Sequence, residues 1–150
     1  MDDRAARGWI WASLTLQLIG YVFDALWHGL VHPGVEPATV RDMALHLATV
    51  HLPLYVGAAS ALASTATAVL RRRRRSSNGR ASTIAVLGAV VSAGAEGWHA
   101  ASHLRLDTHS APIAGTLSFV GFLVVVVAMS RSRRGRRSRA AEATNERDAA

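Results

Sequence analysis

The sequence predicts an all-α membrane protein, a bundle of four transmembrane helices. Half of its 150 residues are hydrophobic, and they fall into four apolar stretches at about 8–31, 43–70, 82–104 and 112–130. A helix needs about 20 mostly apolar residues to cross a bilayer, so each stretch is long enough. Because they fill nearly all of residues 1–131, we expect one membrane domain and no separate soluble one.

The placement of the basic residues predicts the orientation. All 17 are arginines, gathered before the first stretch, between the second and third, and after the fourth. Each of the two other connections carries one arginine, Arg41 or Arg105. Since cytoplasmic loops are enriched in basic residues, both termini are predicted to lie in the cytoplasm of a multi-pass plasma-membrane protein. Residues 132–150, basic and then polar, are predicted to form a disordered cytoplasmic tail.

The net charge of +7 has two readings. Arginine runs can bind nucleic acid, but beside transmembrane helices they are explained by orientation and by attraction to anionic lipid. Membrane lipid is therefore the expected partner, and nucleic acid is not. The chain has no cysteine, which excludes disulfides and thiolate ligands.

A short motif occurs in both halves of the chain. Its two copies are Trp27-His28-x3-His32 and Trp98-His99-x3-His103, offset by 71 residues. An acidic residue stands just upstream of each copy, and each copy leads to a stretch with an early proline, Pro53 or Pro112. Both halves start on the same side of the membrane, so we predict two parallel two-helix repeats.

Nine ionisable side chains gather at the predicted outer end of the four stretches, a position where they are costly. A charged side chain at the centre of a membrane helix costs about 2.5–3.5 kcal/mol on insertion scales. Imidazole and carboxylate groups converging at one depth predict a metal site, since positions three or four apart share a helix face. The predicted ligands are Asp24, His28, His32, His46, His51, Glu96, His99, His103 and His109.

The spacing of His46 and His51 does not fit one face of a regular helix. Five residues rotate the side chain by about 140° at 3.6 residues per turn, so both reach the core only if the helix is distorted. Pro53 supplies a cause, because proline removes a backbone hydrogen bond. We expect Asp42, four residues before His46, to orient its ring, and we rank His51 above His46 as a ligand.

The ligand set limits the metal. Oxygen and imidazole ligands without thiolate favour iron or copper, permit zinc or manganese and disfavour iron–sulfur clusters. More than four ligands exceed one tetrahedral ion, so a dinuclear site is predicted. Glu96-x-x-His99 has the spacing of di-iron carboxylate bundles. The segment His28 to His32 has no glutamate after its first histidine, which argues against an HExxH protease.

Two families resemble this arrangement. The histidine-rich spans are similar in ligand type to the histidine-box membrane oxygenases and desaturases, although the HxxHH pair is missing here. Asp24-x3-His28 resembles the Asp-x3-His metal motif in the membrane subunit of particulate methane and ammonia monooxygenases. Either resemblance, which covers only a few residues, implies a metal centre that activates oxygen.

Four functions are compatible with these features. The favoured one is an oxygen-activating oxidase or hydroxylase that acts on a lipophilic substrate. The others are a protein that binds, delivers or transports copper or a divalent ion, a cytochrome with haem between His28 and His99, and an accessory or pH-responsive subunit. Carboxylates crowded beside those histidines disfavour haem. A chain this small leaves little room for a substrate domain, which favours a homo-oligomer or a partner subunit.

Overall fold

The computed structural model describes residues 3–33, 35, 37–74, 80–107 and 110–148, and the regular structure within these ranges is all helical. The helices are α1 (Asp3–Leu26), which continues into the π-helix η1 (Trp27–Val31), α2 (Val40–Thr49), α3 (Leu52–Arg74), α4 (Arg80–Leu104) and α5 (Ala111–Asp148). Four segments are long and apolar enough to cross a membrane, which confirms the predicted class: Arg4–Val31, Leu52–Arg71, Ala81–Leu104 and Pro112–Arg133.

The second predicted stretch differs from the structure because it is broken. Residues 43–49 belong to the short helix α2, the chain bends at His51, and the spanning helix α3 begins at Leu52. Pro53 is the second residue of α3, where its missing N–H would have had no partner within the helix. The distortion expected near Pro53 is therefore a complete break between two helices.

The C-terminal end of α1 is also irregular. From Trp27 to Val31 the chain widens into a π-helix, closed by a bond from the His32 amide to the Trp27 carbonyl at 2.8 Å. Single π-turns inside α-helices are uncommon and frequently occur at functional sites. His28 lies in this widened turn.

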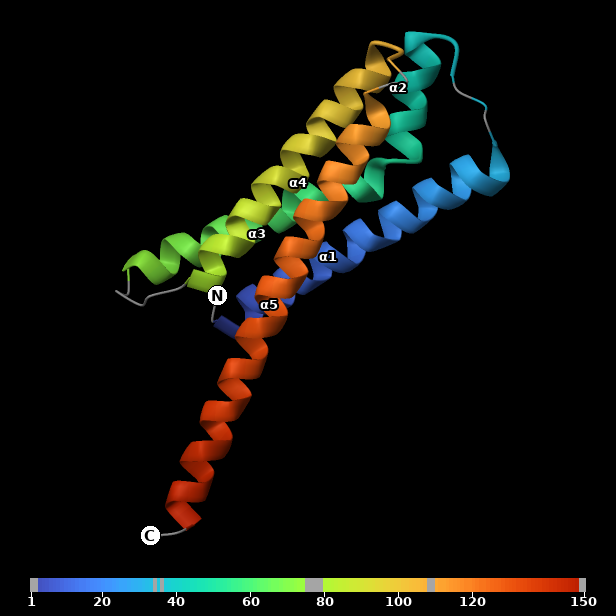
Figure 1. The fold of residues 1–150 in the computed structure, drawn as a ribbon. Helices are drawn as coiled ribbons and strands as arrows, with labels where there is room; N and C mark the ends of the chain where they lie inside the picture. The colour runs from blue at the N-terminus through green and yellow to red at the C-terminus, as the bar shows by residue number, and fades with distance from the viewer. Residues whose placement is uncertain (1–2, 34, 36, 75–79, 108–109, 149–150) are drawn as a thin grey trace.

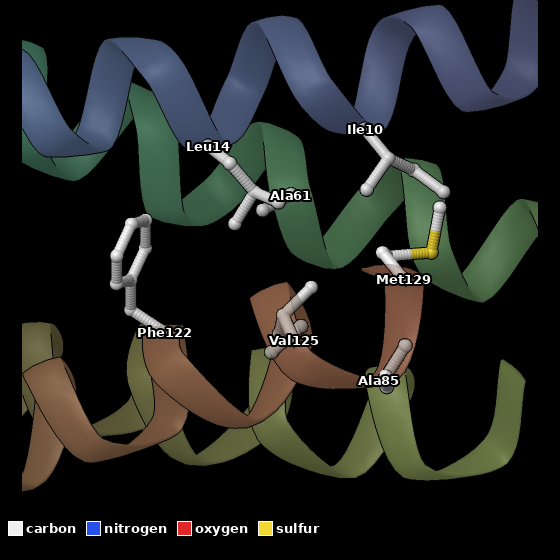
Figure 2. Packing of buried hydrophobic residues seen from close by; sticks show 9 residues of the cluster. Ile10, Leu14, Ala61, Ala85, Phe122, Val125 and Met129 are labelled. Atoms are coloured by element: carbon white, nitrogen blue, oxygen red, sulfur yellow. The ribbon is translucent and has the colours of Figure 1, made fainter. Parts of the chain in front are cut away.

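The core is built by two helix pairs. α1 packs mainly against α3 and α4 mainly against α5, while α3 joins α4. Figure 2 shows the apolar centre between the pairs, with Ile10 and Leu14 from α1 facing Phe122, Val125 and Met129 from α5. Membrane helices lack a hydrophobic force between them, so close packing must hold such a core together.

Glycines allow each pair to approach closely. A Cβ atom at Gly57 of α3 would lie 2.5 Å from the Gln17 amide nitrogen of α1. A Cβ atom at Gly121 of α5 would lie 2.6 Å from the Gly88 carbonyl oxygen of α4. Both contacts are backbone to backbone, so a larger residue would force the helices apart. Small residues at helix interfaces allow such close approach in membrane proteins.

The last helix extends beyond its predicted span. α5 continues to Asp148, through the region that we expected to be a disordered tail, and its second half projects away from the bundle (Figure 1). Residues 136–148 contain arginine, alanine and glutamate, which are strong helix formers, and no proline. Local propensity is therefore sufficient to continue the helix.

Candidate metal centre

Four polar side chains meet at the end of the bundle where α2 lies, and Figure 1 shows the position of that helix. They are Asp24 of α1, His28 of η1, His46 of α2 and His51 at the bend before α3. We call them the first group. His51 is fully buried and His46 is 8% exposed, whereas the side chains of His28 and Asp24 are 28% and 26% exposed. The break between α2 and α3 lets His46 and His51 face the same point.

The heteroatoms of the first group lie close together. The Nε2 atom of His46 is 3.3 Å from Nε2 of His28 and 3.2 Å from Nε2 of His51. The Oδ1 atom of Asp24 is 3.5 Å from Nε2 of His28 and 3.4 Å from Nε2 of His51. The three ligand nitrogens all lie within 4.8 Å of one another, so this histidine triad could hold a metal ion.

These separations have the length expected between ligands of one ion. Four of the six separations among these atoms lie between 3.2 and 3.5 Å. A tetrahedron with every edge of that length would have its centre about 2.0–2.1 Å from each corner, and zinc–nitrogen bonds are about 2.0–2.1 Å. The hydrogen-bonding capacity of the imidazoles leads to the same conclusion. A neutral imidazole nitrogen carries either one proton or one lone pair, so Nε2 of His46 can form one hydrogen bond although it has two nitrogen neighbours. A cation would satisfy all of these atoms together.

A second group of ionisable side chains lies on α4, beside the first. Nε2 of His99 and Nε2 of His103 are 2.9 Å apart, and Nδ1 of His99 is 3.6 Å from Oε2 of Glu96. The two groups touch through His51, whose ring centroid is 5.2 Å from that of His99 and 5.5 Å from that of His103. The structure thus brings Glu96, His99 and His103 of α4 beside the first group.

Glu96 is the most demanding member of the second group. It is 3% exposed, and neither of its carboxylate oxygens has a hydrogen-bond partner among the described residues. Burying an ionised carboxylate without a hydrogen-bond partner is very costly, and neutralisation by a cation offsets that cost. A metal ion beside His99 and His103 would provide that neutralisation.

The remaining predicted ligands are placed differently. His32 is exposed and packs on the ring of Trp27, with centroids 4.5 Å apart, outside both groups. His109 lies outside the described residues. Asp42 is exposed and does not orient His46 as expected. It accepts a hydrogen bond from the Thr39 hydroxyl at 2.7 Å while its amide donates to that oxygen at 3.1 Å, which caps α2.

A polar network lies one turn further into the bundle. Nε2 of Gln17 donates to the Ser92 hydroxyl at 2.7 Å and to the Tyr21 hydroxyl at 3.0 Å. The hydroxyl of Ser118 lies 2.6 Å from that of Tyr21 and 3.2 Å from that of Ser92. These bonds join α1, α4 and α5, and they engage neutral groups with one another. The network therefore acts as helix packing and offers no ionised group below the site.

Tyr55 is a neighbour of the site that the sequence did not single out. Its ring stacks on that of His51 with centroids 5.8 Å apart, and its hydroxyl is buried without a hydrogen-bond partner in the described part of the chain. Tyr55 follows His51 by four residues, the spacing that places two side chains on one helix face. This four-residue spacing is the sequence feature that could have identified Tyr55 as a neighbour of His51.

The comparisons with known proteins supply no family. No protein-family model, curated protein or solved structure matches the chain. The chemistry of the site therefore has to be argued from its own residues.

Proposed function

We propose that the protein is an integral membrane metalloprotein with a transition-metal centre at the outer end of its helices. The observation that carries this proposal is the set of short separations among Asp24, His28, His46 and His51. Three nitrogens and one oxygen lie 3.2–3.5 Å from their neighbours in an apolar bundle, where such groups are costly, and a shared cation would account for their convergence.

The second group suggests that the centre is dinuclear. A second ion would be held by His99 and His103 and balanced by Glu96, a buried carboxylate that accepts no hydrogen bond from the described residues. His51, a member of the first group, also contacts His99 of the second group and would fix the distance between the two ions. The donors suit iron or copper, which bind imidazole and carboxylate, and they also suit zinc.

We propose oxidation of a lipophilic substrate with oxygen as the function of this centre. A redox metal supplies electron transfer to oxygen, while the residues hold it, exclude water and leave one side accessible. Asp24 and His28, each about a quarter exposed, form that side at the surface of a helix bundle, where a substrate dissolved in lipid would arrive. A homo-oligomer or a partner subunit would supply further substrate contacts.

Metal acceptance or delivery without catalysis is the second candidate, and exposed His32 favours it. Its ring packs on Trp27, whose ring in turn lies 6.1 Å from that of His46, so the three aromatic rings lead from the surface to the first group. Passage through the membrane is less well supported. Below the site, Gln17 and its partners are neutral and bonded to each other.

The orientation and the repeat remain part of the proposal. Arginine enrichment at the opposite end of the helices supports a metal centre on the non-cytoplasmic side. Both α3 and α5 begin one residue before a proline, as two related halves would.

Elemental analysis tests the proposal directly. Protein purified in mild detergent should carry about one to two iron, copper or zinc ions per chain, and both His28→Ala and His99→Ala should reduce that content. An exposed control, His32→Ala, should retain it if the first group is the site. Protein that binds none of these ions would refute a metal function. If metal is bound, oxygen consumption with candidate lipids would separate an oxidase from a delivery protein.

A further inference from the structure

An apolar groove opens between α4 and α5 at the opposite end of the bundle from the histidines. Its volume is about 430 Å³. The lining residues are Ala81, Ile84, Val120, Leu123, Val124, Val127, Ala128 and Arg131. Seven of these eight side chains are hydrocarbon, and Arg131, which is exposed, stands at the end of the groove.

The dimensions of the groove match one leaflet of a bilayer. Along α5 it runs from Val120 to Arg131, and a rise of 1.5 Å per residue gives about 16 Å. The hydrocarbon core of a bilayer is about 30 Å thick, so the groove covers the depth of one leaflet. Arg131 then lies at the level of the headgroups, where a long basic side chain can reach the interface.

We propose that this groove binds one anionic phospholipid, with an acyl chain along α4 and α5 and the phosphate on Arg131. The chemistry of the lining is that of an amphipathic lipid, since the walls are apolar and the single charge is positive. The arginine-rich end is the predicted cytoplasmic side, where anionic lipids are concentrated. The acyl chain of the lipid would cover the apolar walls of the groove, and its phosphate would neutralise the guanidinium group of Arg131.

Native mass spectrometry of the whole chain tests this proposal. Protein is released from micelles with equal amounts of phosphatidylglycerol and phosphatidylcholine, and bound lipids are counted by mass. Wild type should retain one phosphatidylglycerol in preference to phosphatidylcholine. Arg131→Gln should lower that preference about fivefold, the factor that corresponds to about 1 kcal/mol per basic residue near a charged membrane. Val127→Trp should fill the groove and remove the retained lipid.

Matched controls separate the groove from general effects of charge and bulk. Arg4→Gln removes one arginine at the same end of the bundle, and Leu70→Trp adds one tryptophan to an exposed position of α3 there. Both controls should retain lipid as wild type does. Equal retention of the two lipids by wild type, or equal losses in Arg4→Gln and Arg131→Gln, would overturn the proposal. A dimer that Val127→Trp dissociates would also overturn it, because the groove would then hold a second copy of the chain.

Discussion

Replacing His51 by leucine is expected to weaken metal binding by at least about 100-fold. His51 is fully buried, and its Nε2 atom takes part in two of the four short separations of the first group, at 3.2 and 3.4 Å. Mutating a residue that only orients a ligand already costs about 10–100-fold in metal affinity. Removing a ligand itself should cost at least the upper end of that range.

The same loss can be expressed as stability. At a free metal concentration of about 1,000 times the wild-type Kd, binding stabilises the folded protein by about 4.1 kcal/mol. That concentration is only about ten times the Kd of the variant, where binding contributes about 1.4 kcal/mol. The part of the unfolding free energy that depends on metal should therefore fall by about 2.7 kcal/mol.

The assay measures Kd by competition with a chelator and unfolding with and without metal, both in detergent. Leucine roughly preserves the volume of the buried imidazole, but packing can change, so metal-free and metal-loaded forms of the same variant are compared. His32→Leu is the control, since His32 is exposed and lies outside both groups. If His51→Leu binds metal as tightly as His32→Leu does, the assignment of His51 as a ligand is refuted.

Three further predictions concern the packing and the charge around the site. Gly57→Ala should lower both stability and metal affinity, because its Cβ would lie 2.5 Å from the Gln17 amide nitrogen and push α1 from α3. Gly94→Ala, with nothing within 4 Å of the added carbon, should leave both properties intact or improve stability in an unfolding assay. Asp24→Asn should lower the metal content per chain by elemental analysis, with unchanged membrane insertion; an unchanged content would remove Asp24 from the ligands. Gln17→Leu should cost about 0.6–1.7 kcal/mol of stability with metal content preserved, and loss of metal would contradict a packing role for the network.

The helical class was predictable because length and hydropathy determine it. Four apolar stretches can only form helices in a membrane, where every backbone polar group must be bonded internally. The breaks were harder to predict. Pro53 indicated a distortion near His51, but a distortion alone does not predict that α2 ends at Thr49 and α3 begins at Leu52 as two separate helices. The π-helix at Trp27–Val31 contains Gly29 and is followed by Pro33, but neither residue specifies a π-turn rather than an ordinary helix end.

The composition of the site was predictable, and its internal arrangement was not. The cost of ionisable groups in apolar spans indicated that Asp24, His28, His99 and Glu96 share a purpose, and the structure gathers them at one end. Periodicity on a regular helix could not place His46 and His51 together, since their convergence requires the bend. Their metal-binding role stays a prediction until metal is measured.

The division of the bundle into two close-packed pairs has a mechanical consequence. Asp24, His28 and His51 of the first group lie on or beside α1 and α3, and the second group lies on α4, so their imidazoles face one another across the boundary between the pairs. The short helix α2, which carries His46, contacts both α3 and α4. Ions shared across that boundary would act as a cross-link between two rigid bodies. Loading with metal should then slow amide hydrogen exchange in both pairs at once, far from any ligand.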